Sequence, residues 1–234
     1  MGLLETAATT MVGGERRIAS AARNITNANT PGYKREIAYV EVAERSAASH
    51  RAHDVRPTVV STSLTTQGVL TDTGSPLDIA INGSAHLLVR DGDTFALTRG
   101  GQLRLNSDGL LVDALGRAVQ SAGFGDISLS TSTPEITPDG TILEDGMPVS
   151  AIGMFDAGEH KIGASLTADQ RDGLTEGGAS EIRQGMVEKS NVTLSDEMVE
   201  MMRTQRQVES GAQLVRAYDS LMAQAISTFS RGKS

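Results

Sequence analysis

Two histidines three residues apart give this sequence its strongest signal for metal chemistry. His50 and His53, with Asp54 beside them, form a possible metal-binding pair. A zinc site needs three or four ligands, and no further ligand stands at a suitable spacing in this polar, turn-prone stretch. The chain also has no cysteine, which excludes thiolate sites and a cysteine nucleophile. We therefore predict no metal site.

Motifs for catalysis and cofactor binding are missing as well. The sequence contains no G-x-S-x-G elbow and no P-loop, and Gly123-Phe-Gly125 lacks the third glycine of a dinucleotide fingerprint. Most carboxylates stand in turns such as Asp91-Gly-Asp93, where aspartate stabilises the turn itself. His160 lies in a polar turn and is expected to be solvated. The sequence predicts a protein without catalytic residues and without a cofactor.

Composition points to a protein that gains stability by assembly. The 234 residues include 38% hydrophobic and 3% aromatic side chains, 25 glycines and no tryptophan, which is lean for a thick core. The net charge of −8 is concentrated in the middle of the chain, which argues against nucleic acid as a partner. No apolar run approaches the ~20 residues that span a membrane, and no cleavable secretory signal is evident. We expect a protein that is not inserted in a membrane.

An apolar repeat of seven residues organises the C-terminal end. A heptad repeat predicts a long helix that winds around a partner, because a helix with one apolar stripe is not stable alone in water. Thr193 or Ser195 can cap this helix, and Asp196 and Glu197 suit its first turn. The residues at the interval of seven are Leu194, Met201, Val208, Val215, Met222 and Phe229, with Met198, Ala212 and Ile226 at +4 positions between them.

The N-terminal end repeats this pattern. Leu4, Met11, Ile18 and Ile25 are again seven apart, which predicts a second amphipathic helix. Gly13-Gly14 interrupts it, as either a kink or a packing site for a neighbouring backbone. Asn29-Thr30-Pro31-Gly32 ends it, because proline cannot continue the helix. The two ends of the chain most simply pair with each other.

The region between the two helices is β-rich. Short apolar runs alternate with turn dipeptides such as Asn82-Gly83, Asp108-Gly109 and Asp145-Gly146, which favour antiparallel hairpins. We therefore predict an α+β fold, in which N- and C-terminal helices pair as a coiled coil and flank a mainly antiparallel β module. The predicted segments are an N-terminal helix (1–33), an extended arm (34–66), the β module (67–182) and a C-terminal helix (183–234).

Four motifs in the same order resemble those of bacterial flagellar rod and hook proteins, and together they cover nearly the whole chain. The first runs from Asn24 to Arg35, the second from Gln67 to Gly83, the third from Thr98 to Gly116, and the fourth from Glu188 to Arg206. The residues that carry the resemblance are Asn24, Asn27, Ala28, Asn29, Thr30, Pro31, Gly32, Tyr33, Gly74, Leu77, Asp78, Ala80, Ile81, Gly83, Thr98, Arg99, Ser190, Asn191, Val192, Gln205 and Arg206.

This resemblance implies a structural subunit of the flagellar basal body. The paired helices would form the inner tube of a hollow axial rod that crosses the periplasm and transmits torque to the hook. Its partners would be copies of itself, other rod proteins, both proximal and distal, and the flagellar type III export apparatus, which takes subunits without a cleaved signal. The short central module favours a proximal rod protein, and the alternatives are a distal rod or hook protein.

Two departures from the family pattern stand out. The family has an aromatic pair where this chain has Ala85-His86-Leu87, so His86 is expected to pack inside the β module. An asparagine of the C-terminal helix is replaced by Ser210-Gly211. A hypothesis of another class is a β binding module displayed on a coiled coil, which would form a small closed oligomer. Because two long helices cannot bury every face in a monomer, we also expect them to be partly disordered until assembly.

Overall fold

The computed structural model describes residues 3–42, 57–158, 160 and 162–231, with side chains for 9–41, 58–158, 160 and 162–227. The histidine pair that was considered for metal binding, His50 and His53 with Asp54, lies outside the described residues, as do the side chains of Leu4 and Phe229. The elements in chain order are α1 (Leu3–Thr26), β1 (Glu36–Val42), β2 (Pro57–Ser63), β3 (Leu70–Asp72), β4 (Ile79–Asn82), β5 (His86–Asp91), β6 (Thr94–Thr98), β7 (Arg104–Leu105), β8 (Leu111–Val112), β9 (Ala118–Val119), β10 (Glu135–Ile136), β11 (Thr141–Glu144), β12 (Met147–Ala151), β13 (Met154–Phe155), α2 (Ala168–Asp172), β14 (Glu181–Gln184), β15 (Met186–Glu188) and α3 (Leu194–Arg231).

The chain folds into two compact units. The helical unit contains residues 1–26, 36–62 and 193–234, and the β-rich unit contains residues 27–35 and 63–192. The chain therefore passes between the units four times. The division into four segments, 1–33, 34–66, 67–182 and 183–234, remains a prediction.

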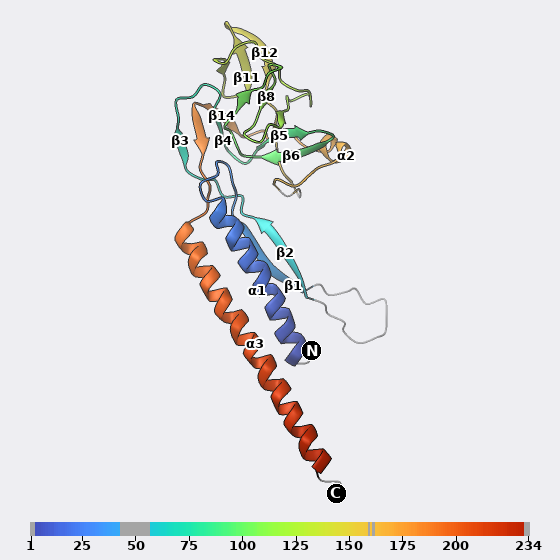
Figure 1. Ribbon diagram of the computed structural model, residues 1–234. Coiled ribbons are helices and arrows are strands. Elements are labelled where there is room, and N and C mark those ends of the chain that lie inside the picture. The colour runs from blue at the N-terminus through green and yellow to red at the C-terminus, as the bar shows by residue number, and fades with distance from the viewer. Residues whose placement is uncertain (1–2, 43–56, 159, 161, 232–234) are drawn as a thin grey trace. The chain divides into compact units, whose positions relative to one another are not determined.

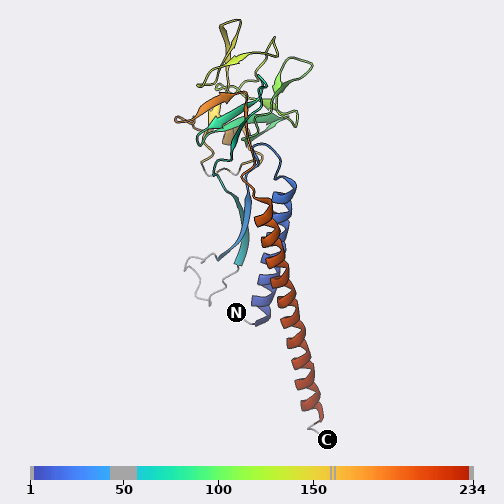
Figure 2. The same ribbon diagram turned by 90° about the vertical axis from the view of Figure 1, so that its left-hand side faces the viewer.

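In the helical unit α1 and α3 lie side by side, as both views show (Figures 1 and 2). They are antiparallel, because Asn24 near the end of α1 meets Glu197 at the start of α3, while Met11 meets Gly211 further on. β1 packs on α1 and pairs with β2. The predicted α+β class with paired terminal helices is confirmed.

The β-rich unit consists of several small sheets around a shared core. β5 is central: β6 pairs with it along its length, β9 pairs at Val89 and Arg90, and β13 pairs at His86 and Leu87. The other ladders are antiparallel too, and join β10-β11-β12, β7-β8-β9, β14-β4 and β15-β3. The core includes Leu87, Leu111 and Ile142, which are no more than 1% exposed.

Two of the three predicted hairpin turns join paired strands: Asp108-Gly109 lies between β7 and β8, and Asp145-Gly146 lies between β11 and β12. The prediction for Asn82-Gly83 is wrong, because it connects β4 to β5 and β4 pairs with β14 instead. Asp145 and Gly146 join β11 to β12 as a two-residue loop, and both have positive φ, 51° and 78°. That pair of conformations matches the twist of the flanking strands and explains the Asp-Gly dipeptide. The C-terminal helix begins at Leu194, next to the two predicted capping residues Thr193 and Ser195, and residues 181–188 before it are hydrogen-bonded as strands to β4 and β3.

Candidate functional site: a helical seam and a buried polar junction

The first candidate site is the face of α3 that meets α1, called the seam below. Met201, Val208 and Val215 lie on it at intervals of seven and are half-buried. Between them stand Thr204, Gly211 and Tyr218 at +3 positions, so the inward residues alternate by three and four as in a heptad. The predicted +4 residues differ: Met198 is 49% exposed and Ile226 is 67% exposed, while Ala212 is half-buried.

Small residues let the two helices come close at the centre of the seam. A Cβ on Gly14 would lie 2.3 Å from Val208 Cγ2, and one on Gly13 would lie 3.1 Å from Val40 Cγ2 of β1. Gly211 faces Met11 in the same way, at 3.4 Å from its Cγ. The helix assignment of α1 continues through Gly13-Gly14. Of the two alternatives for these glycines, packing is therefore the one that the structure supports.

Asn24 of the first motif ties three elements of the helical unit together. Its side chain is buried, and its Nδ2 donates to Glu197 Oε2 of α3 at 2.9 Å and to the Glu36 carbonyl at 2.8 Å. Its Oδ1 accepts from the Glu36 amide at 2.8 Å. The side-chain amide of Asn24 thus forms hydrogen bonds with both the N–H and the carbonyl of Glu36 at the start of β1, as the backbone of a neighbouring strand would. Ser20 adds a hydrogen bond to the Glu36 carbonyl at 2.7 Å.

The C-terminal part of α3 lies beyond the reach of α1. Antiparallel helices advance by the same rise per residue, so the contacts of Asn24 and Met11 place Leu3 level with about Asp219. Ser220–Ser230, called the uncovered stretch below, contains no charged residue. Its described side chains are all exposed, including Leu221 at 65%, Met222 at 47% and Ile226 at 67%. Figure 1 shows α3 continuing past the N-terminal end of α1.

The remaining predicted interface residues differ in how far they are buried. Ile18 and Ile25 on α1 are half-buried, as is Met11. Leu194 is 45% exposed at the first residue of α3. The role of these residues in assembly stays a prediction.

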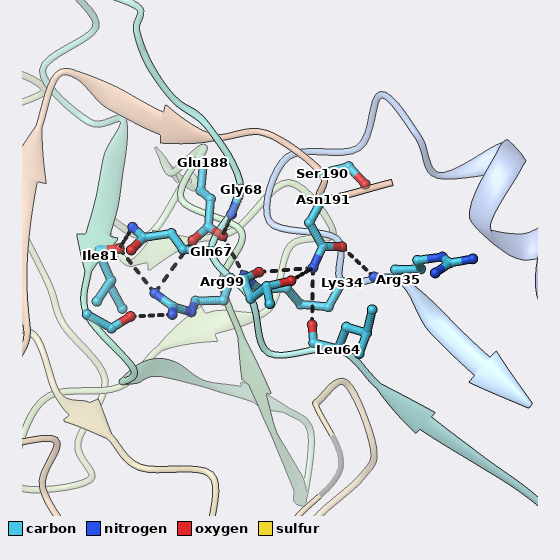
Figure 3. Close-up of polar contacts among 12 residues, drawn as sticks. Lys34, Arg35, Leu64, Gln67, Gly68, Ile81, Arg99, Glu188, Ser190 and Asn191 are labelled. Atoms are coloured by element: carbon cyan, nitrogen blue, oxygen red, sulfur yellow. Dashed lines mark hydrogen bonds and ion pairs between the residues drawn. The ribbon is translucent and has the colours of Figure 1, made fainter. Parts of the chain in front are cut away.

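The second candidate site lies in the β-rich unit, where four chain segments meet (Figure 3). Lys34 comes from the first motif, Gly68 from the second, Arg99 from the third, and Glu188 and Asn191 from the fourth. We call this group the junction. Lys34, Arg99 and Glu188 are each less than 6% exposed although all three carry charge.

One carboxylate serves both buried cations. Lys34 Nζ lies 2.5 Å from Glu188 Oε1, and Arg99 Nη1 lies 3.5 Å from Glu188 Oε2. Glu188 Oε1 also accepts from the Gly68 amide at 2.8 Å. Backbone carbonyls accept further hydrogen bonds from the two cations: Lys34 donates to the carbonyl of Thr66, and Arg99 donates to the carbonyls of Ile81 and Gly83.

Burial sets the electrostatics of this group. Desolvation lowers the pKa of Lys34, and the hydrogen bond and charge of Glu188 oppose that shift. Desolvation likewise lowers the pKa of Arg99, again opposed by Glu188. Without Glu188 two cations would be buried with no counter-charge. Removing one partner of a buried ion group costs far more free energy of folding than removing one partner of an exposed ion pair.

Asn191 forms hydrogen bonds to the backbone of neighbouring chain segments at the junction. Its Oδ1 accepts from the Arg35 amide at 2.7 Å, and its Nδ2 donates to the carbonyls of Leu64 at 3.2 Å and Thr66 at 2.9 Å. Thr66 Oγ1 is within 3.0 Å as well. One side chain therefore ties two backbone segments, at Arg35 and at Leu64–Thr66, to its own, which is far from both in the sequence (Figure 3).

Gly32 explains the Pro-Gly pair of the first motif. Its amide donates to the Glu188 carbonyl at 2.7 Å, its φ is 71°, and a Cβ there would lie 2.3 Å from the Arg99 carbonyl carbon. Both the conformation and the close approach require glycine. The preceding motif residues, Asn27 to Pro31, form the turn that leads into it, with Thr30 donating to Asn27, and Tyr33 follows it with its amide donating to the Thr30 carbonyl.

The other motif residues shape the strands around the junction or stand apart from it. Ala80 and Ile81 are buried in β4, and Leu77 packs against the core. Asp78 accepts from Thr73 at 2.7 Å, next to the turn at Gly74. Further members are Gly83 and Thr98 at strand ends, Ser190, whose Oγ accepts from the Val192 amide, and the exposed Gln205 and Arg206 on α3.

Sequence reasoning did not select Lys34, Gly68 or Glu188 as site residues. Lys34 and Glu188 are 154 residues apart, and neither periodicity nor spacing links them. Among the described residues no group of three or more histidine, cysteine, aspartate or glutamate side chains could hold a metal ion. Within the same ranges no helix is long and apolar enough to cross a membrane.

Comparison with known proteins identifies the family. Residues 183–228 match the family described as flagellar basal body rod FlgEFG protein C-terminal. The flagellar basal-body rod protein FlgF of Mesorhizobium japonicum is 32% identical over 224 residues, which cover 92% of this chain and 92% of the relative. FlgF of Rhizobium meliloti is 30% identical over 230 residues, with 92% of each chain covered. FlgG of Bacillus subtilis is 27% identical over 241 residues, covering 87% of this chain and 89% of the relative.

The resemblance seen in the four motifs is thus confirmed over nearly the full length, with FlgF proteins at about 30% identity. Within the β-rich unit the motif residues lie at the junction and in the strands around it, and within the helical unit they lie on α1 and α3. The chain belongs to the flagellar basal-body rod protein family and is a structural subunit of the rod, not an enzyme.

Proposed function

We propose that this subunit assembles with copies of itself through α1 and α3 into the hollow axial rod that transmits torque. The uncovered stretch of α3 is the observation that carries this proposal. It continues the seam past the end of α1, is uncharged, and exposes Leu221, Met222 and Ile226 to solvent. Burying an apolar side chain of this size on a neighbouring subunit stabilises the assembly by about 1.5–3 kcal/mol.

The position in the rod is a further part of the proposal. We infer a proximal rod subunit that contacts other rod proteins and reaches the periplasm through the flagellar type III export apparatus, without cleavage of a signal. The relatives at 32% and 30% identity are named FlgF, whereas the FlgG relative is at 27%. Restored motility in a strain that lacks FlgF, but not in one that lacks FlgG, would support the proximal position. The opposite pattern would indicate the distal one.

Leu221→Asp tests the assembly surface directly. It places a charge on the uncovered stretch without removing a contact inside the monomer, so the folded monomer should keep its stability. We expect assembly, followed by sedimentation of the purified full chain, and motility in complemented cells to be lost. Leu115→Asp is the matched control, since Leu115 is 78% exposed in the β-rich unit.

Three outcomes separate the alternatives. Loss of assembly with Leu221→Asp alone supports the proposal, and normal assembly and motility with this variant would contradict it. A wild-type chain that forms only a small closed oligomer would favour a displayed binding module. Val208→Asp is a poorer probe, because Val208 already packs against Gly14 of the same chain.

A further inference from the structure

His86 is a buried histidine inside the β-rich unit that the assembly function does not use. It is the first residue of β5, is 2% exposed, and pairs with Phe155 of β13. Neither ring nitrogen meets a partner at hydrogen-bonding geometry among the described residues. A buried ring without partners tolerates the neutral form far better than the charged one.

The neighbours of His86 make a positive charge there more costly still. Arg99 directly follows β6, one residue beyond the paired Leu87 and Thr98, and its charge acts on the ring. Lys34 of the junction also acts on the ring, and Glu188, the one buried carboxylate nearby, already serves both cations. On the β13 side the nearest acid is Asp156, which is half-buried and accepts from Ser84 at 3.3 Å. Protonation would therefore place a third cation beside one shared carboxylate.

We propose that His86 makes the β-rich unit an acid-sensitive element, in which protonation of the ring breaks the packing at the start of β5 and opens the junction beside it. At neutral pH the ring is neutral and stays buried at the start of β5. In acid the unfolded chain binds a proton that the folded chain resists. The proposal concerns the fold of the subunit and does not depend on how subunits assemble.

The direction of the effect follows from proton linkage. Burial, with Arg99 and then Lys34, lowers the pKa of His86 from 6.5 to about 4, while the backbone of Phe155 and the charge of Asp156 oppose this shift. The contribution of the neutral ring is complete above pH 6.5 and is lost as the pH falls toward 4. At pH 4.5 the equilibrium constant for unfolding should have risen by roughly 80-fold from this residue alone.

The test compares the pH dependence of unfolding in three full-length chains. Urea unfolding of the β-rich unit is measured between pH 7.5 and 4.5 for the wild type, His86→Phe and His160→Gln. Carboxylates titrate in all three, so the difference between wild type and His86→Phe isolates the ring. We expect that difference to change by roughly 80-fold in the unfolding constant over this range, and His160→Gln to follow the wild type. Parallel curves for wild type and His86→Phe would overturn the proposal.

A measurement on the wild type keeps the test valid if His86→Phe does not fold. The imidazole signals of the four histidines are followed by NMR during an acid titration of the folded chain. One signal should stay neutral below pH 5 and change only as the unit opens. If all four titrate near 6.5 while the fold is intact, the proposal is wrong.

Discussion

At the scale of single residues, the junction shows how a charged side chain can be essential to a fold without any catalytic role. Glu188 accepts from Lys34 and from the Gly68 amide, and it is the counter-charge of Arg99. All three charged groups are buried, so none can turn to water when its partner is lost. The junction is therefore expected to be the most sensitive polar point of the β-rich unit.

Glu188→Gln should destabilise the β-rich unit by about 3–5 kcal/mol, because it leaves two buried cations without a carboxylate. Urea unfolding at pH 7 measures this change. Glu181→Gln is the matched control: Glu181 pairs with Arg183 at 3.0 Å, but both side chains are about half exposed. An exposed pair of this kind contributes roughly 0–1 kcal/mol. Equal effects of the two substitutions would show that the junction is not the buried ion group described above.

The sequence could predict the helices far better than the junction. The interval of seven from Met201 to Val215 marks an inward face, and the structure has it on the side of α1. Met198 and Ile226, predicted between the residues of that repeat, are exposed in the single chain, so their role in contacts with neighbouring subunits stays a prediction. The structure turns Thr204 and Gly211 inward, since small residues allow the close approach at Gly14. Lys34 and Glu188 could not be paired, because tertiary folding alone brings them together.

At the scale of elements, the close contact between α1 and α3 depends on glycines, which have no side chain at the points where the helices meet. Replacing glycine by alanine inside a helix normally stabilises it by about 1 kcal/mol. At Gly14 the new Cβ would lie 2.3 Å from a methyl group of Val208, and a β-branched side chain has little freedom to turn away. At Gly211 the nearest atom, Met11 Cγ, is at 3.4 Å, which is an ordinary contact.

We therefore expect Gly14→Ala to destabilise the helical unit by roughly 1–2 kcal/mol, because overpacking outweighs helix propensity. Gly211→Ala should leave the stability unchanged or raise it. Thermal unfolding followed by far-UV circular dichroism measures both. Adding Val208→Ala to Gly14→Ala should recover part of the loss, which a change in propensity alone would not do. A stabilising Gly14→Ala would show that the helices do not meet as closely as this.

At the scale of the whole molecule, the chain divides its stability unevenly between two units. The β-rich unit has a core of side chains such as Leu88, Leu97 and Leu111 that are fully buried. The helical unit has the seam, one sheet of two strands, and an α3 whose last turns are uncovered. Apolar surface that stays exposed at the end of α3 remains available for assembly. The region of lowest local stability is therefore the one that we propose to bind a neighbouring subunit.

Hydrogen exchange of the dilute, full-length subunit should therefore follow this order. Amides of β5 and β6 are expected to exchange most slowly, those of α3 from Glu197 to Tyr218 faster, and those of the uncovered stretch fastest. The reason is that few buried contacts oppose local opening beyond Asp219. On assembly the uncovered stretch should gain protection by at least tenfold, while β5 and β6 stay as they were. If the uncovered stretch exchanged as slowly as the seam in dilute subunit, its ordering could not be coupled to assembly, and the predicted gain of order on rod formation would be wrong.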